Sequence, residues 1–269
     1  MEHESVPEQT MTANTANDSA YRLTMSNLIF SAAYGLRLPI ETAAIAMVYF
    51  HMYLDLLGYE TLKESTGDTQ TMITAIVFLA CKTSENIRTI RDVFNIVYCS
   101  SAPHEELDAK VMDSHYRKKK SNVIILEQHI LRAVGFNIEV DLPYKYMFNI
   151  ARVLDLSQEC VVRTLRYIND TFSSNIVTRV PADIIAIACI VIATKQEQEQ
   201  HSQQQEQNQE QGVGDNGQPL DGQPLPGRVL QEAWWRNFNV PDQTVFEAVQ
   251  EIIQRHDSIS MALSMMNSM

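Results

Sequence analysis

The residues of this chain that could perform catalysis are scattered rather than grouped in a catalytic motif. None of its 7 histidines forms a His-Glu-x-x-His motif or an i, i+4 pair, and none of its 4 cysteines forms a Cys-x-x-Cys pair, although zinc sites usually need such spacings. No serine stands in a Gly-x-Ser-x-Gly turn, and five of the 9 glycines fall between residues 212 and 227 instead of in a phosphate-binding loop. We therefore expect no catalytic residue, no metal site and no cofactor.

Two charged residues are placed where they could take part in binding. Lys82 ends an alanine-rich apolar segment, where a cation complements the dipole of a helix C-terminus. Glu127 lies in a later amphipathic segment, among apolar residues that we expect to pack beside the first segment. A local helix cap and a surface acid would explain these positions as well as a binding site would. The pattern alone leaves both interpretations open.

The densest basic run extends from Arg117 to Lys120. We expect it at or just before the N-terminus of a helix that starts near Asn122, where cations oppose the helix dipole, so helix propensity does not explain the run. It is either a solvated charged turn, a contact for an acidic or phosphorylated partner, or a nuclear import signal.

The distribution of charge and apolar residues argues against nucleic-acid and membrane partners. The formal net charge is -12, but residues 1–20 and 196–227 hold ten acidic residues and no Lys or Arg, which leaves about -2 for the rest. A duplex-binding surface needs an excess of Lys and Arg. The longest apolar run, residues 184–193, is shorter than the roughly 20 residues of a membrane helix. Separated cysteines without a signal sequence favour a reducing, intracellular compartment.

The spacing of apolar residues predicts an all-α fold. Apolar side chains recur at three- and four-residue steps, prolines stand where helices are expected to begin, and Gly35, Gly58 and Gly135 stand where they are expected to end. We expect helices over residues 21–35, 39–57, 69–85, 88–98 and 122–134 in the first half, and over 143–154, 157–173, 181–195, 228–238 and 241–255 in the second. A polar loop is expected over residues 99–116.

The two halves contain a similar central segment. The residues from Ile73 to Lys82 align without gaps with those from Ala186 to Lys195, and both segments are alanine-rich, apolar nearly all round, and end in lysine. A helix without a polar face must be surrounded by other helices. The sequence therefore predicts two tandem five-helix bundles, each built around one of these segments. A pair of buried parallel strands is the alternative, which the length and the alanines disfavour.

Two parts of the chain are predicted to lack a packed structure. Residues 1–19 are rich in Ser, Thr, Asn and Glu without apolar periodicity, which is typical of a mobile tail. Residues 196–227 are rich first in Gln and Glu and then in Gly and Pro, and they offer too little apolar area to offset the entropy of ordering the chain. We interpret them as a disordered insertion in the second bundle, either a tolerated low-complexity expansion or a partner-binding segment.

Several motifs resemble those of the cyclin family. The residues from Leu79 to Glu85 fit the pattern Leu-Ala-x-Lys-x-x-Glu, and those from Arg88 to Asn95 fit Arg-x-x-Arg-Asp-Val-x-Asn, both typical of the first cyclin box. Glu127 and the two repeats strengthen this resemblance, which covers both boxes. It implies an N-terminal cyclin box over residues 20–141 and a C-terminal cyclin box over 142–257 that contains the insertion 196–227, with tails at 1–19 and 258–269.

Further segments resemble the transcription- and splicing-associated branch of that family. The residues from Asn122 to Glu127 and from Asp141 to Lys145 are most similar to cyclin L, whereas Trp234-Trp235 is more like cyclin K. In cyclins the first box docks on a protein kinase and orders its active conformation, and the cyclin itself transfers no phosphate. The resemblance implies a kinase-binding surface formed by Lys82, Glu127, Glu85, Phe78, Ile87 and Ile130. Ser84 departs from the acidic residue that usually precedes Glu85.

We therefore predict a nuclear, non-catalytic regulatory subunit. It would form a heterodimer with a cyclin-dependent kinase and activate it in RNA polymerase II transcription or pre-mRNA processing. General transcription factor IIB also contains two cyclin-like repeats, so a nucleic-acid-binding module is the alternative. The nearly neutral charge outside the two acidic stretches argues against that alternative. An all-α enzyme is a third hypothesis, which no motif supports.

Overall fold

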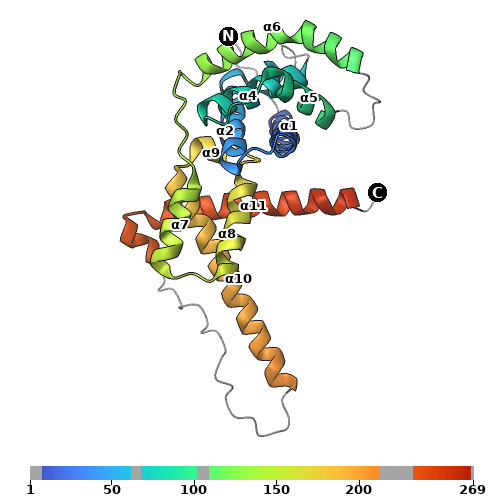
Figure 1. The fold of residues 1–269 in the computed structure, drawn as a ribbon. Helices are drawn as coiled ribbons and strands as arrows, with labels where there is room; N and C mark the ends of the chain where they lie inside the picture. Colours follow the sequence, from blue (N-terminus) through green and yellow to red (C-terminus); the bar gives the residue numbers. More distant parts are fainter. Residues whose placement is uncertain (1–7, 62–67, 102–108, 212–232, 268–269) are drawn as a thin grey trace, which may run out of the picture. The chain divides into compact units, whose positions relative to one another are not determined.

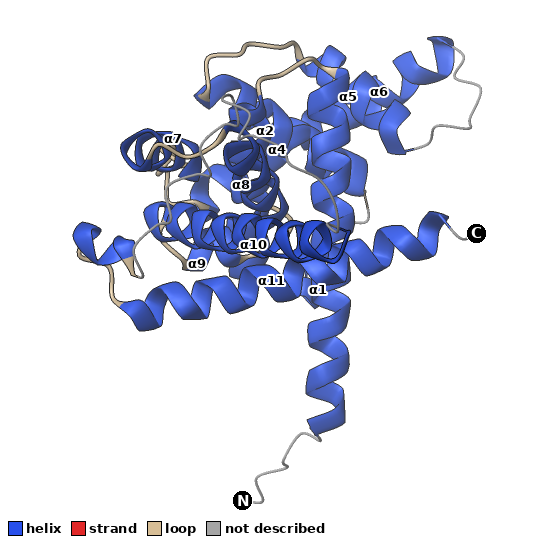
Figure 2. Cartoon of the chain, turned by 90° about the horizontal axis from the view of Figure 1, so that it is seen from below, coloured by secondary structure: helices blue, strands red, loops and turns tan. Residues whose placement is uncertain are grey.

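The computed structural model of the chain describes residues 8–61, 68–101, 109–211 and 233–267. Over these residues the regular elements are all helices, as predicted (Figures 1 and 2). The chain divides into two compact units. The first comprises Met1–Leu142 together with Phe172–Arg179, and the second comprises Pro143–Thr171 together with Val180–Met269.

The first unit is built around helix α4 (Thr69–Thr83). Helix α4 packs against all four long helices of this unit, which are α1 (Glu8–Gly35), α2 (Ile40–Leu57), α5 (Ile90–Ser101) and α6 (Ala109–Ala133). Its eleven consecutive residues from Thr71 to Cys81 are buried. The prediction of a central helix surrounded on every side is therefore confirmed, and the alternative of a buried strand is wrong.

The second unit repeats this arrangement around helix α10 (Ala182–Gln211). Helix α10 packs against α7 (Pro143–Leu154), α8 (Gln158–Thr171) and α11 (Asp242–Asn267), and its residues from Ile185 to Thr194 are buried. Before α11, a single 3-10 helix, η1 (Trp234–Phe238), takes the place of the helix predicted over 228–238. Residues 228–232 lie outside the described part of the chain.

Helix ends follow the predicted proline and glycine positions closely. Pro143 is the first residue of α7, and Pro39 directly precedes α2. Gly58 ends α2 with a φ of 80° while its N–H donates to the Leu54 carbonyl, and Gly135 follows α6 with a φ of 64°. These left-handed conformations cost glycine little because it has no Cβ.

A short segment of the second sequence repeat belongs to the first unit. Helix α9 (Ile176–Arg179) packs on α2, and the side chains of Phe172 and Ile176 are each only 1% exposed. The sequence predicts one C-terminal cyclin box over residues 142–257, whereas residues 172–179 within that range group with the first unit. Their two apolar side chains and a polar cluster described below fasten them to the first unit.

Four helices extend further than the sequence predicts. Helix α1 includes residues 8–19 and helix α11 includes residues 258–267, both of which were predicted as tails. Helix α6 includes residues 109–116, which were predicted as a loop, and helix α10 includes residues 196–211, which were predicted as part of the insertion. Helix propagation is easier than nucleation, so a helix started by packing continues through Gln and Glu, which are good helix formers. In α1 the ion pair between Asp18 and Arg22 supports one added turn. The predicted disorder of residues 1–7, 212–227 and 268–269 falls outside the described residues.

Helix α2 is long and apolar enough to cross a bilayer by length and composition alone. However, 61% of this 18-residue helix is buried inside the structure, as expected of a core helix.

Candidate functional site

Lys82 and Glu127 meet at the surface of the first unit. Lys82 is in the last turn of α4 and Glu127 is in α6, and the Lys82 Nζ lies 2.5 Å from the Glu127 Oε1. The Lys82 side chain is 48% exposed, whereas that of Glu127 is 9% exposed. Beneath this ion pair, the Lys82 Nζ lies 4.3 Å from the centroid of the Phe78 ring, within range of a cation–π contact. The structure thus brings together three of the predicted site residues.

This geometry fixes the Lys82 ammonium group while leaving it accessible. An ammonium group has three N–H donors, of which the ion pair uses one. The nearly buried Glu127 carboxylate depends on Lys82 for compensation of its charge, because a buried charge without a partner is costly. Lys82 therefore offers a positioned positive charge and further hydrogen-bond donors to a partner.

The segment after α4 is held by hydrogen bonds to α2. Asn86 Nδ2 donates to Thr42 Oγ1 over 2.9 Å, and the Ser84 hydroxyl donates to the Ala80 carbonyl over 2.7 Å while accepting from Thr42 Oγ1 over 3.0 Å. The serine that replaces the usual acidic residue therefore has intramolecular partners. Glu85, exposed and in a left-handed conformation with a φ of 58°, follows it.

Three exposed apolar side chains lie at the same end of the first unit. Ile87 is 78% exposed, Phe136 is 66% exposed and Ile138 is 48% exposed. The Tyr49 hydroxyl of α2 donates to the Ile138 carbonyl over 2.8 Å and lies 3.2 Å from Thr83 Oγ1 at the end of α4. One hydroxyl group thus joins the segment after α6 to the end of α4. The sequence does not identify Phe136 and Ile138 as anchors, although Phe136 directly follows Gly135, the glycine that marks the end of α6.

Two predicted anchor residues are buried rather than exposed. Ile130 has 0% of its surface exposed, because it lies three residues after Glu127 on the face of α6 that packs on α4, together with Val123 and Val134. Phe78 is 9% exposed and supports Lys82 from below. Ile130 therefore offers no surface to a partner in this structure, and Phe78 offers little.

The basic run from Arg117 to Lys120 lies inside α6 rather than near its N-terminus, which corrects our prediction. Lys119 forms an ion pair with Asp68, whose Oδ2 lies 2.6 Å from the Lys119 Nζ at the start of α4. Although burial raises the pKa of Asp68, Lys119 and Thr71 outweigh it and hold that pKa below its ordinary value. Since α6 begins at Ala109, the run does not oppose the dipole at a helix N-terminus.

Comparison with known proteins identifies the family of this chain. The family model "Cyclin, N-terminal domain" matches residues 1–139 and again residues 142–210, which together exceed half of the chain. The chain belongs to the cyclin family. The two matches agree with the two helical repeats.

The curated relatives of this cyclin include cyclin L proteins. It is 32% identical to Cyclin-L1 of Xenopus laevis over 193 residues, covering 69% of this chain and 37% of that protein. It is 27% identical to Cyclin-L1 of Homo sapiens over 210 residues, covering 74% and 39%, and 28% identical to Cyclin-L2 of Mus musculus over 193 residues, covering 70% and 36%. This cyclin therefore spans less than two fifths of the length of these relatives.

A solved structure with a similar fold comes from the yeast RNA Pol II CTD kinase CTDK-1 complex. The TM-score is 0.63 at 16% sequence identity, and the match covers 94% of this cyclin and 73% of that chain. At this identity the likeness shows the fold. Cyclins are non-catalytic regulatory subunits, so family membership confirms the prediction that this chain is not an enzyme.

The described cysteines of this cyclin are packing residues rather than nucleophiles, with one exposed exception. Burial raises the pKa of Cys81 and of Cys160 to about 11, and it raises the pKa of the fully enclosed Cys189 as well. Thiols with such pKa values stay protonated at neutral pH and react slowly. Cys99 is exposed. Among the residues that the structure describes, no group of three or more metal-binding side chains comes together.

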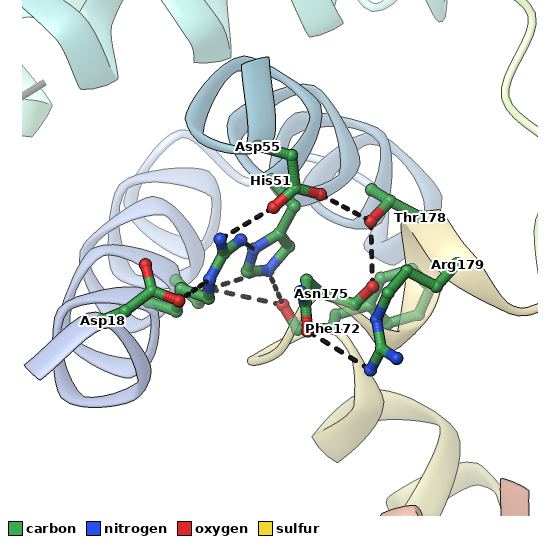
Figure 3. Close-up of polar contacts among 9 residues, drawn as sticks. Asp18, His51, Asp55, Phe172, Asn175, Thr178 and Arg179 are labelled. Atoms are coloured by element: carbon green, nitrogen blue, oxygen red, sulfur yellow. Dashed lines mark hydrogen bonds and ion pairs between the residues drawn. The ribbon is translucent and has the colours of Figure 1, made fainter. Parts of the chain in front are cut away.

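A second polar cluster lies inside the first unit of this cyclin and holds residues 172–179 in place (Figure 3). Arg22 is 7% exposed and bonds to Asp18 Oδ2 over 2.8 Å, to Asp55 Oδ1 over 2.7 Å and to His51 Nδ1 over 3.2 Å. Asp55 also accepts a 2.8 Å hydrogen bond from Thr178 Oγ1 of α9. The carboxylate of Asp55 thus links α1 and α2 to α9.

His51 is the centre of this cluster and is fully buried. Its Nε2 donates to the Phe172 carbonyl oxygen over 2.9 Å, while its Nδ1 accepts from the Arg22 guanidinium group. A carbonyl oxygen only accepts and a guanidinium group only donates, so these contacts specify the neutral imidazole with its proton on Nε2. Satisfied on both ring nitrogens and closed off from solvent, His51 fastens residue 172 to α2 and leaves no room for a substrate.

Proposed function

We propose that this cyclin binds a cyclin-dependent protein kinase through the surface of its first unit and activates it as the regulatory subunit of a heterodimer. The observation that carries the proposal is the ion pair of Lys82 and Glu127, because both residues occupy the positions that the family motif implies for kinase binding. We define the kinase-binding surface as Lys82, Glu127, Glu85, Ile87 and Phe136.

The members of this surface have different roles. Ile87 and Phe136 are exposed apolar side chains on backbone segments fixed by Asn86 and Tyr49, so they can be buried by a partner without ordering a mobile loop. Lys82 supplies the positioned charge, and charged groups of this kind set the register of a complex more than its affinity. Phe78 and Ile130 are buried below this surface, where they help to pack α4 against α6.

Activation follows if the surface fits one kinase conformation better than another. A regulatory subunit shifts a conformational equilibrium only by the ratio of its affinities for the two states, and equal affinity shifts nothing. The described surface is rigid, because its backbone segments are hydrogen-bonded to α2 on both sides. A rigid surface penalises a kinase conformation that does not match it, and this penalty provides the required preference.

The proposed kinase acts in RNA polymerase II transcription or pre-mRNA processing in the nucleus. Two findings support this process. The curated relatives include cyclin L1 and cyclin L2, and a chain with the same fold occurs in a complex that phosphorylates the RNA polymerase II C-terminal domain. Within the basic run, Lys119 forms an ion pair with Asp68, so part of the run's charge is compensated inside this chain, which weakens the nucleic-acid-binding alternative.

The test is affinity capture of the tagged full-length chain from nuclear extract, followed by identification of the captured proteins and a phosphorylation assay on a C-terminal-domain repeat peptide. We expect one cyclin-dependent kinase at equal stoichiometry and activity in the eluate. Capture of general transcription machinery without a kinase, together with a salt-dependent shift of duplex DNA, would favour the alternative.

A further inference from the structure

The second unit contains a cavity of about 450 Å³ to which the kinase-binding proposal assigns no role. Ligand pockets in proteins usually measure about 300–1,000 Å³, so this cavity is large enough to hold a side chain or a short peptide segment. Its wall comes from the end of the buried part of α10, from η1 and from the start of α11. It is lined by Val191, Thr194, Lys195, Gln198, Ala233, Trp234, Trp235, Arg236, Asp242 and Phe246.

Aromatic rings form the apolar part of this cavity, which we call the tryptophan pocket. Trp234 and Trp235 pack edge to face with centroids 5.9 Å apart, and Trp235 packs in the same way on Phe246 at 6.0 Å. Phe246 is 46% exposed, so an apolar surface remains open to a ligand. The rings are fixed, because Trp235 Nε1 donates to Asp242 Oδ1 over 2.9 Å and η1 is flanked by residues in left-handed conformations.

The charged residues of the tryptophan pocket leave an excess of positive charge. The Asp242 carboxylate is engaged by Arg236, which binds it with two nitrogens, and by Trp235. Lys195 is exposed, and among the residues that the structure describes it forms no ion pair. Arg236 and Asp242 neutralise each other, so the lining keeps one uncompensated cation, Lys195, in a chain whose formal net charge is -12. A ligand that carries negative charge complements this pocket.

Lys195 is also the counterpart of Lys82 in the internal repeat. The segments that end in these two lysines align without gaps, and each lysine follows the buried part of the central helix of its unit. In the first unit the ammonium group lies over Phe78 and pairs with Glu127 of the same chain. In the second unit the lysine lines a cavity with aromatic rings, and the carboxylate of that cavity, Asp242, is bound by Arg236 and Trp235 rather than by the lysine. Lys195 can therefore accept a carboxylate from another molecule.

We propose that the tryptophan pocket is a docking site for an acidic peptide segment of a partner protein, which places an aromatic or aliphatic side chain against the exposed Phe246 and a carboxylate on Lys195. Such a site is separate from the kinase-binding surface of the first unit. It would allow this cyclin to hold a second protein, a substrate or an adaptor, while its first unit is occupied.

The chain provides its own probe for this interaction. Trp234 and Trp235 are the only two tryptophans of the 269-residue chain, so intrinsic tryptophan fluorescence of this chain reports on the tryptophan pocket alone. The titrant is a short capped peptide of aspartate and glutamate with a central phenylalanine. Three matched peptides serve as comparisons: one with asparagine and glutamine in place of the acids, one with glycine in place of phenylalanine, and one with lysine in place of the acids.

We expect a saturable change of fluorescence with the acidic phenylalanine peptide, weaker binding of the glycine and amide peptides, and no binding of the lysine peptide. Added salt should weaken the binding because the contact includes exposed charges. Replacing the exposed lysine by Lys195→Gln should reduce the affinity about fivefold or more, and Lys82→Gln in the first unit should leave it unchanged.

Four results would overturn the proposal. The first three are the absence of a saturable change with the acidic peptide, equal affinities for the acidic and amide peptides, and an unchanged affinity in the Lys195→Gln variant. A fourth is tighter binding of a single-stranded oligonucleotide than of the acidic peptide, which would assign the aromatic rings to base stacking instead. Each of these results leaves the kinase-binding proposal standing, because that proposal involves only the first unit.

Discussion

Lys82 and Glu127 are 45 residues apart in the sequence, and their charged atoms lie 2.5 Å apart at the edge of the first unit. Helix α4 places the lysine and helix α6 places the glutamate, so the ion pair forms only when these two helices pack side by side. The pair is asymmetric, since the lysine is about half exposed and the glutamate is nearly buried. The ion pair therefore depends on the packing of α4 on α6, and it also presents the positive charge of Lys82 to solvent.

Replacing Lys82 or Glu127 by alanine should weaken kinase activation. Each change removes one half of a preorganised contact, so we expect the cyclin concentration needed for half-maximal activation to rise roughly tenfold. The double variant should lose little more than either single variant, because residues that act as a unit are not additive. The measurement is the kinase activity as a function of cyclin concentration.

A matched control for this prediction is Lys195→Ala, which removes the repeat counterpart of Lys82 in the second unit. It should leave kinase activation unchanged, and all variants should retain the circular dichroism of the native chain. Full activation by the Lys82→Ala and Glu127→Ala variants would show that the kinase binds elsewhere.

Replacing exposed apolar residues near the ion pair should affect kinase binding, whereas replacing buried ones should affect the stability of the first unit. Ile87→Ala and Phe136→Ala should lower the affinity for the kinase without lowering the free energy of unfolding, because both side chains are mostly exposed. Ile130→Ala removes a fully buried side chain and should reduce the free energy of unfolding by about 2–5 kcal/mol. Denaturant titration and kinase binding together separate the two effects.

The exposed Tyr34 of α1, which is 79% exposed, provides a comparison. Tyr34→Ala should change neither the affinity for the kinase nor the free energy of unfolding. If it weakened kinase binding as much as Ile87→Ala does, the loss would reflect a general effect of removing surface apolar groups.

Replacing His51 by alanine should destabilise the first unit. The substitution removes the hydrogen bond to the Phe172 carbonyl and one partner of the buried Arg22, and we expect a loss of about 2–4 kcal/mol. His129→Ala, at an exposed position on α6, is the control and should cost little. Hydrogen exchange should show that protection is lost first around residues 172–179; protection that persisted there in the His51 variant would contradict the role we assign to the cluster.

Only Cys99 among the four cysteines should react with a thiol reagent in the native protein. The pKa values of Cys81 and Cys160 are raised to about 11 by burial, so their reactive thiolate forms are scarce at neutral pH and only increase as the pH approaches that value. Counting labelled thiols before and after denaturation should give one and then four. A Cys99→Ser variant that still labelled in the native state would show that a buried cysteine becomes accessible.

Much of the fold could be predicted from the sequence because its strongest signals are local. The apolar segments that end in Lys82 and Lys195 had to be surrounded, and prolines and glycines marked helix ends within a residue or two. Helix length could not be predicted where a helix continues beyond its packed part, as α10 does after Lys195. The composition of that segment suggests disorder, but a helix that is already formed by packing extends easily into the residues that follow it.

The candidate site was predictable in its charged residues and not in all of its apolar ones. Lys82 and Glu127 were found through motif spacing, but the exposure of Ile130 depends on which face of α6 packs on α4, a tertiary property. The role of Tyr49 was likewise hidden, because its hydroxyl donates to the carbonyl of Ile138, which is 89 residues away along the chain. The assignment of residues 172–179 to the first unit depends on His51 and Asp55, which no local pattern connects to them.

The most direct test of the proposed function is the phosphorylation rate of the co-purified kinase, measured with the kinase at fixed concentration and the purified chain added in steps. We expect a rate that is low without the chain, rises with each addition and saturates at one chain per kinase. A rate that stays at its starting value while the two proteins form a stable complex would show that the chain binds the kinase without activating it, and would contradict the proposed function.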